Sequence, residues 1–284
     1  MHQHFPGWQA QYALLQALLQ APFPPAVLVH APHSPARAAA LVRAAVHAPR
    51  IAHTSPLLAP TPAAFFADVA RQLGVPPASD MPALLDRVRG APTVIVVADA
   101  PRMRDMWPEG LWLALPRLAE LAGAPGYVAV VLVSALPWAA FRTAAGDTVS
   151  FAPVVVRLPR LGRADTLALL AADVPDDSAL HRSFCALLYD SAHTAVRDEQ
   201  ALRLIAAAVW RVLATAMRRG LAPPTLAGLR PHLAPLIRDA LAVLVPRIEG
   251  PVAWAAKWEE RLGAGQGERP GVADSAAATN TTPT

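Results

Sequence analysis

The sequence predicts an α/β fold in which a parallel sheet with flanking helices is followed by an all-helical region. Short apolar, β-branched segments alternate with helical patterns over residues 1–160, which is the arrangement of β-α-β units around a parallel sheet. These segments hold few polar residues, as expected for strands that are covered on both faces. From Arg163 onward the sequence shows helical patterns and no strand candidate.

The composition is typical of a soluble globular protein and excludes several classes of chemistry. Of the 284 residues 54% are apolar and 16% are charged, and the net charge is +4. One cysteine, Cys185, excludes an intrachain disulfide, and the scattered histidines predict no metal site. The only lysine is Lys257, which excludes lysine-dependent chemistry in the first 256 residues. The longest apolar stretch, Tyr127–Phe141, is too short to span a membrane, so we expect no membrane partner.

Five segments of the first part have the apolar character of buried strands. They are Ala26–His30, Arg50–Thr54, Thr93–Val97, Val128–Val133 and Val154–Leu158. The segments around them carry apolar residues at helical spacing, and one of them starts on a proline, which suits a first helical turn. The predicted helices are Gln9–Gln20, Ala36–His47, Pro62–Leu73, Met81–Val88 and Leu111–Leu121.

The second part of the chain is predicted to be helical throughout, because its apolar residues recur at helical spacing. The predicted helices are Arg163–Ala172, Ser178–Tyr189, Arg197–Arg219 and Leu229–Ile248. The fourth is expected to bend near Pro235 and to end at Pro246. After Leu262 the sequence loses its periodicity, which predicts a disordered tail.

The turn after the first strand has the spacing of a phosphate-binding loop and almost none of its chemistry. Against the pattern GxxxxGK[ST], Ala31 and Ala36 take the glycine positions, Arg37 the lysine position and Ala38 the hydroxyl position. A Cβ obstructs the approach of a phosphate, and an alanine offers magnesium no hydroxyl. Prolines at positions 32 and 35 each remove an amide donor. The turn is either a degenerate nucleotide pocket or an ordinary strand-turn-helix connection, and the spacing alone favours the second.

Two later strand ends carry one polar residue each. Asp99 follows Thr93–Val97 without an acidic neighbour, so we expect its carboxylate to cap the following turn rather than to hold a metal. Ser134 ends the next strand and is expected to hydrogen-bond its own turn. An α/β enzyme that uses Asp99 and Ser134 is an alternative, and it requires both side chains to converge on a pocket with a base.

Several blocks of residues, taken in their order and spacing, resemble the ATPase subunits of the origin recognition complex. The blocks are Phe5-Pro6-Gly7-Trp8, Arg104-Asp105-Met106, Leu115–Leu121, Phe151-Ala152-Pro153 and Pro231-His232-Leu233. The resemblance covers residues 5–260 and is greatest to the subunit 5 branch of that family.

This resemblance implies a P-loop NTPase-like (AAA+) architecture. It divides the chain into a base domain (1–160), a helical lid (161–222), a further helical segment (223–262) and a disordered tail (263–284). The family's nucleotide positions carry over to Ala31, Ala36, Arg37 and Ala38 in Walker A, Asp99 in Walker B, Ser134 as sensor 1 and Arg203 as sensor 2. The resemblance also implies one wedge of a nuclear ring around origin DNA, with subunits four and three as neighbours and DNA contacted through the complex.

The departures from the family pattern predict a subunit without ATP hydrolysis, with no catalytic residue and no bound cofactor. The alternative is that Arg37 and the remaining amides hold ATP without turnover. The family continues into a C-terminal winged-helix domain, which we expect this chain to lack. Four arginines are candidate contacts to a neighbour's nucleotide or to DNA phosphates, although a solvated helix face is the simpler explanation of each. They are Arg102, Arg104, Arg117 and Arg142.

Overall fold

The computed structural model describes residues 5–141, 151–172, 179–196, 198–221, 225–244 and 250–264. The chain forms two compact units, which are described separately below. The first comprises Met1–Pro175 and Tyr189–Arg203, and the second comprises Asp176–Leu188 and Leu204–Thr284. Arg142, Pro246 and nearly all of the predicted tail lie outside the described residues. The domain bounds given by the sequence remain a prediction.

The first unit contains a sheet of five parallel strands in the order β2-β3-β4-β1-β5. The strands are β1 (Ala26–His30), β2 (Arg50–Thr54), β3 (Thr93–Val97), β4 (Val128–Ser134) and β5 (Val154–Arg157). The register between β1 and β4 pairs His30 with Ser134, so both strands end at the same level. All five predicted strands are confirmed within one residue of their bounds.

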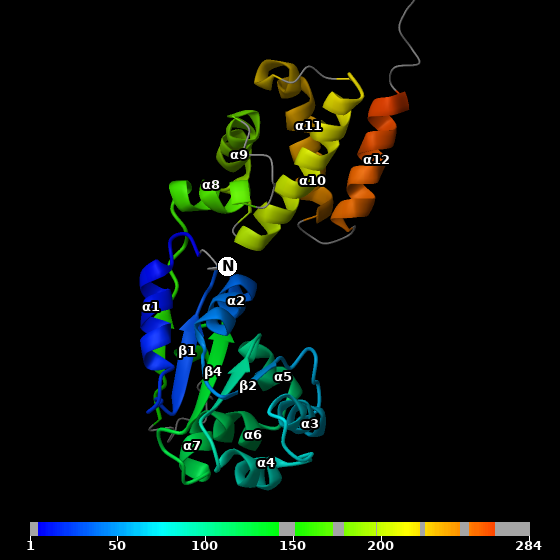
Figure 1. Ribbon diagram of the computed structural model, residues 1–284. Coiled ribbons are helices and arrows are strands. Elements are labelled where there is room, and N and C mark those ends of the chain that lie inside the picture. The colour runs from blue at the N-terminus through cyan, green and yellow to red at the C-terminus, as the bar shows by residue number, and fades with distance from the viewer. Residues whose placement is uncertain are drawn as a thin grey trace, which may run out of the picture. The chain divides into compact units, whose positions relative to one another are not determined.

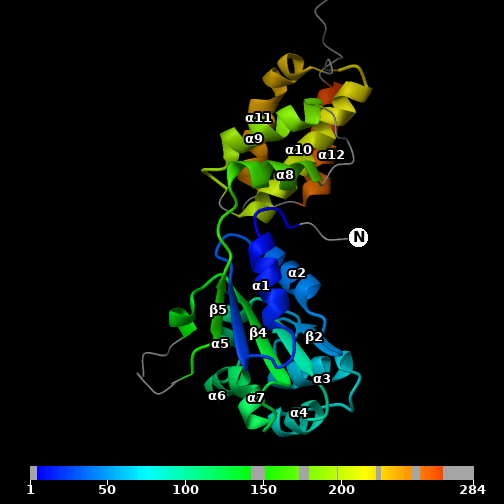
Figure 2. The same ribbon diagram turned by 60° about the vertical axis from the view of Figure 1, so that its left-hand side comes forward.

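Helices cover both faces of this sheet (Figures 1 and 2). Alternate residues of β4 enter two separate cores, because successive side chains of a strand point to opposite faces. Val131 lies in one core with Leu15 of α1 (Gln9–Leu18) and Leu41 of α2 (Pro35–Ala45). Val130 lies in the other core with Phe65 of α3 (Pro62–Gln72) and Leu84 of α4 (Met81–Val88). The sheet is therefore the middle layer of three, as the apolar strands predicted.

The segment after β3 differs from the prediction of one helix over Leu111–Leu121. It consists of η1 (Ala100–Arg102), α5 (Met103–Met106), α6 (Glu109–Ala114), η2 (Leu115–Arg117) and α7 (Leu118–Leu121). Pro116 has no N–H to donate to a carbonyl four residues earlier, which interrupts the helix at η2. A further short helix, η3 (Trp138–Phe141), follows β4.

The remaining elements are helical. α8 (Arg163–Ala172) belongs to the first unit, whereas α9 (Ala179–Ala192) and α10 (Glu199–Arg218) contribute residues to both units. The second unit also contains α11 (Leu226–Leu244), which continues through two prolines, and α12 (Pro251–Ala264), which the sequence did not predict as a separate helix. Among the described helices α10 alone is long and apolar enough to cross a membrane, and half of that stretch is buried within the protein, as in a core helix.

Candidate functional site

The turn between β1 and α2 uses several of its backbone groups internally. The amide of Ala31 donates to the carbonyl of Ser134 over 2.8 Å, and the amide of Ala38 donates to the carbonyl of Ser34 over 3.0 Å. Pro32 and Pro35 have no amide hydrogen. Of the eight residues 31–38, at most four therefore have an amide for a ligand (eight less two prolines and two amides already used). Ala38 is fully buried in the core beneath the turn.

Arg37 turns into the protein at the position where a phosphate-binding loop has its lysine. Its side chain is only 5% exposed. One terminal nitrogen donates to the carbonyl of Pro6 over 2.9 Å, and the other lies 3.5 Å from a carboxylate oxygen of Glu199. The guanidinium also stacks on the ring of Trp8, 4.1 Å from its centroid. Arg37 therefore acts as a structural cation in this conformation.

Glu199 is the first residue of α10 and joins this turn to a second loop. Its carboxylate accepts a hydrogen bond from the amide of Leu161 over 3.2 Å, and its own amide donates to the carbonyl of His33 over 3.4 Å. Trp8 donates from its indole nitrogen to the carbonyl of Pro159 over 2.9 Å. We call the four residues Pro6, Trp8, Arg37 and Glu199 the Arg37 cluster. The cluster links the N-terminal segment, the turn, the β5–α8 connection and α10.

Burial dominates the electrostatics of the Arg37–Glu199 pair. It lowers the pKa of Arg37, partly offset by the charge of Glu199 and its hydrogen bond to Arg37. It also raises the pKa of Glu199, against the opposing effects of the Leu161 amide and of Arg37. The predicted sensor-2 residue, Arg203, lies near enough that its charge further lowers the pKa of Arg37. The structure therefore places two of the predicted site residues, Arg37 and Arg203, within electrostatic range of each other.

Asp99 makes a different contact from the predicted one. Its backbone is left-handed (φ 51°, ψ 36°), a conformation that Asp tolerates better than most residues. Its carboxylate accepts from the hydroxyl of Ser55, which follows β2, over 3.0 Å. The following turn is closed by the backbone carbonyl of Asp99, which accepts from the amide of Arg102. The prediction that the carboxylate caps this turn is therefore wrong, because the side chain makes no capping hydrogen bond there and contacts Ser55 after β2 instead.

Ser134 is completely buried and hydrogen-bonds its own turn, as predicted. Its hydroxyl donates to the carbonyl of Leu136 over 2.7 Å and accepts from the amide of Leu136 over 2.8 Å. Asp99 and Ser134 thus have separate partners, and no hydrogen bond among the described residues joins them. The convergence that the enzyme alternative requires is not seen in this part of the chain. Within the same residues, no group of three His, Cys, Asp or Glu side chains is placed to hold a metal ion.

The fold is shared with solved structures of replication proteins, although no family model and no curated protein matches the sequence. A chain of the Drosophila ORC bound to DNA has a TM-score of 0.64 at 23% identity, over 84% of this chain and 68% of that one. The ADP form of the Aeropyrum pernix ORC2 protein has a TM-score of 0.59 at 13% identity, over 85% and 71%. The Cdc6p structure from Pyrobaculum aerophilum has a TM-score of 0.51 at 13% identity, over 77% and 64%. The chain therefore has the AAA+ fold of the ORC and Cdc6 proteins, a parallel sheet with flanking helices followed by a helical region.

Proposed function

We propose that this chain is a non-catalytic AAA+ subunit of an origin recognition complex, with an architectural role in the initiation of DNA replication. The fold and the sequence blocks described above support membership of such a complex. The observation that carries the non-catalytic part is the state of Arg37. The only cation at the lysine position of the loop is buried against Glu199, Pro6 and Trp8.

The residues at the other positions of a hydrolytic site also have structural contacts in this fold. Hydrolysis in P-loop NTPases needs a hydroxyl and an acidic residue to hold magnesium, and a group that orients the attacking water. At the hydroxyl position Ala38 places a methyl group in the core. The single carboxylate after β3, Asp99, accepts a hydrogen bond from Ser55. The proposal therefore predicts no ATP turnover above the uncatalysed rate.

The partners follow from the same proposal. The chain is expected to sit in a nuclear complex with the other origin recognition subunits, in the position of subunit 5 between subunits four and three. DNA is then contacted through the complex as a whole. The neighbour from Drosophila is itself an ORC bound to DNA, which supports this class of partner.

A pulldown tests the assembly. Tagged chain expressed in its own organism is recovered from nuclear extract and its partners are quantified by mass spectrometry. We expect stoichiometric recovery of other origin recognition subunits. Their absence, with soluble and folded bait, contradicts the proposed function.

An ATPase assay on the recovered complex tests whether this chain is non-catalytic. Arg37→Met in this chain is expected to leave any ATP turnover of the complex unchanged when the complex stays intact.

A second candidate function, ATP binding without hydrolysis, is favoured by one observation. The hydroxyl of Ser34, which is 1% exposed, has no hydrogen-bond partner within the described residues. Ser34 precedes the first turn of α2, and helix N-termini attract anions. A bound phosphate would satisfy this hydroxyl. The Aeropyrum pernix neighbour was solved in its ADP form, so the fold accommodates a nucleotide in that protein.

Titration with a fluorescent ATP analogue separates the two candidates. The non-catalytic subunit without nucleotide is expected to show no saturation below about 1 mM, which corresponds to about 4 kcal/mol of binding free energy. Saturation in the micromolar range, lost in Ser34→Ala and retained in Ser55→Ala, supports structural ATP binding instead.

A further inference from the structure

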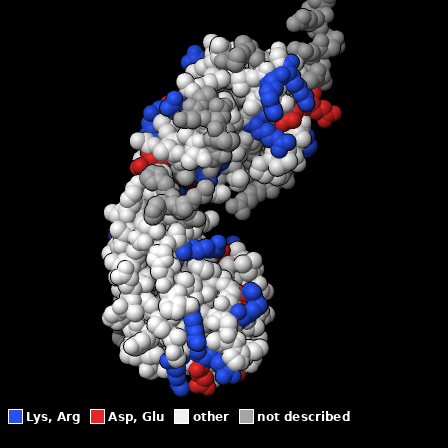
Figure 3. All heavy atoms as spheres, in the orientation of Figure 1, with Lys and Arg blue, Asp and Glu red and all other residues white. Residues whose placement is uncertain are grey.

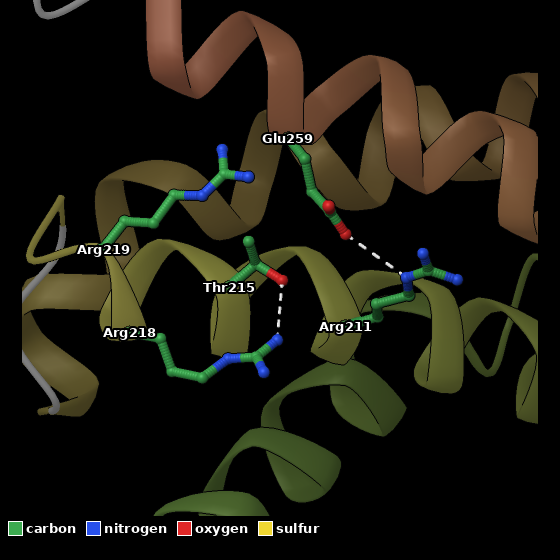
Figure 4. A pocket seen from close by; sticks show the side chains of 5 residues that line it. All are labelled: Arg211, Thr215, Arg218, Arg219 and Glu259. Atoms are coloured by element: carbon green, nitrogen blue, oxygen red, sulfur yellow. Dashed lines mark hydrogen bonds and ion pairs between the residues drawn. The ribbon is translucent and has the colours of Figure 1, made fainter.

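A groove in the second unit is lined by charged residues of α10 and α12. Its volume is about 350 Å³, and its lining residues are Arg211, Thr215, Arg218, Arg219 and Glu259. Arg211, Thr215 and Arg218 of α10 are spaced by four and three positions, so they share one face of the helix, and Arg219 follows directly after the end of α10. Figure 4 shows their side chains along α10, with Glu259 projecting from α12 towards them. We call this feature the α10–α12 groove.

The arginines of the groove differ in how far their charge is already neutralised. Arg211 donates to Glu259 over 3.2 Å, and its side chain is still 48% exposed. Arg218 donates to the hydroxyl of Thr215 over 3.1 Å, a contact that neutralises no charge. Arg219 is exposed, and its side chain has no hydrogen bond or ion pair within the described part of the chain. Three cations thus face one anion, which leaves a formal excess of two positive charges.

The chemistry of the lining points to phosphate as the group that is recognised. Guanidinium groups hydrogen-bond phosphate oxygens in pairs, and a threonine hydroxyl can add a further donor. Among the residues that the structure describes, no aromatic or aliphatic side chain lines the groove, so none of them would hold a nucleobase or an acyl chain. A ligand would be bound through its charge and not through an apolar body.

The length of the arginine row favours an extended ligand over a single phosphate group. Residues 211 and 219 are eight positions apart, which corresponds to about 12 Å along a helix axis. Figure 3 shows the basic side chains gathered beside acidic ones over the α10 and α12 portion of this face. We propose that the α10–α12 groove binds the phosphodiester backbone of a nucleic acid, without reading its bases.

Glu259 sets the strength of this interaction. It is 18% exposed and occupies Arg211, so an incoming phosphate must compete with a carboxylate that is already in place. Binding is therefore weak, independent of sequence and sensitive to salt, as expected for contacts to the nucleic-acid backbone alone. The groove lies wholly within the second unit, and it neither involves the Arg37 cluster nor depends on assembly of the chain into a complex.

Fluorescence anisotropy of the full chain with a labelled DNA duplex tests the proposal. In low salt we expect a dissociation constant in the range of about 1–100 μM, typical of nonspecific binding. Arg219→Gln weakens binding several-fold and lowers the slope of log K against log salt by about 1. Glu259→Gln tightens binding, because it removes the competing carboxylate. Arg238→Gln is the matched control, since Arg238 is an exposed arginine of α11 outside the groove with the same loss of charge.

Competition distinguishes the sources of the anion. Duplex DNA competes in a manner that depends on Arg219, whereas inorganic phosphate and ATP compete only at millimolar concentrations. Tighter binding of ATP than of DNA, sensitive to Arg219→Gln, overturns the proposal in favour of a mononucleotide site. Equal competition by a polyglutamate peptide overturns it in favour of an acidic protein partner. Equal DNA affinity in Arg219→Gln, Arg238→Gln and the unmodified chain overturns it outright, provided that circular dichroism shows that both variants are folded.

Discussion

The Arg37 cluster and the α10–α12 groove both place arginine next to glutamate, and they differ in almost every other respect. The Arg37 side chain is 5% exposed and its partner Glu199 is 6% exposed. The corresponding values in the groove are 48% for Arg211 and 18% for Glu259. In the cluster the guanidinium also contacts a carbonyl and an aromatic ring. In the groove a third arginine, Arg219, makes no such contact among the described residues.

The difference shows that burial decides what an arginine can do in this protein. A guanidinium has five N–H donors, and it can bind a ligand only through those donors that the protein does not already use. Arg37 uses its donors for contacts within the protein, although it lies at the lysine position of a phosphate-binding loop. The groove arginines keep donors free in solvent, although no sequence pattern marks them as a site. Sequence position alone therefore marks Arg37 as the candidate ligand-binding arginine and does not mark the groove arginines, although Arg37 is buried and Arg211 is about half exposed.

The largest expected effect comes from breaking the buried pair. Arg37→Met leaves the carboxylate of Glu199 buried without its cation, which typically costs about 3–5 kcal/mol of unfolding free energy. Glu199→Gln leaves Arg37 with Pro6 and Trp8 and replaces a carboxylate whose ionised form is disfavoured by burial, so we expect a much smaller loss than in Arg37→Met. The double variant loses less than the sum of the two single losses, because neither charge remains. Urea denaturation at pH 7, followed by circular dichroism, measures all three.

A matched exposed pair sharpens this test. Arg163 and Asp190 make two hydrogen bonds of 3.0 and 3.1 Å, yet both side chains are more than half exposed. Arg163→Met is expected to change stability little, since solvent screens such pairs. Equal losses in Arg37→Met and Arg163→Met contradict the view that burial distinguishes the two kinds of arginine.

The second prediction concerns how tightly the N-terminal segment closes the cluster. Gly7 lies between Pro6 and Trp8 with φ of +76°, and an added Cβ would stand 2.6 Å from Leu161 Cδ2. Gly7→Ala therefore combines backbone strain of about 1–2 kcal/mol with overpacking of about 1–3 kcal/mol. Gly74→Ala is the control, because Gly74 also has a positive φ but has no atom within 4 Å of the added Cβ. Thermal unfolding should show the larger loss at position 7.

The strands could be predicted from the sequence because their evidence is local. Thr93–Val97 is a run of β-branched residues in which every position is buried, and that pattern needs no knowledge of the rest of the chain. The same holds for Ser134, whose partners are two residues away. The interruption at Pro116 was also local, and the missing amide of proline would have predicted it.

The Arg37 cluster could not be predicted, because its partners are distant in sequence. Glu199 lies 162 residues from Arg37, and an acidic residue in the first helical turn usually has a purely local role towards the helix dipole. The one available signal was Arg37 itself, a cation in the first turn of an alanine-rich helix whose other charged residue, Arg43, lies in the last turn. Such a residue at a position that becomes buried requires a partner. The identity of that partner emerges only from the fold.

The third prediction uses pH to show that Glu199 is buried. Burial raises its pKa above the ordinary value of 4.5 in the folded state. The folded state then binds the proton more tightly than the unfolded state, so the stability that Glu199 contributes is fully present below pH 4.5 and is lost as pH rises through the raised pKa. The difference in unfolding free energy between the unmodified chain and Glu199→Gln should therefore change across this window. A difference that stays constant from pH 4 to 8 contradicts the burial of this carboxylate.

The smallest expected effect on stability is that of replacing the glutamate of the α10–α12 groove by glutamine. Glu259→Gln removes a carboxylate whose partner, Arg211, is about half exposed, so the stability should change by less than about 1 kcal/mol. The arginines of the groove repel one another, and the removal of Glu259 leaves that repulsion unopposed, so we expect a small loss rather than a gain. Added salt should shrink the loss further by screening the three cations. Salt screens the buried pair at Glu199 much less than the exposed pair at Glu259. The loss of stability in Glu199→Gln should therefore change little between 50 mM and 500 mM salt. Denaturation of both variants at these two salt concentrations tests the contrast directly. If the two losses respond equally to salt, the two glutamates lie in similar environments and the distinction between a closed structural site and an open binding site fails.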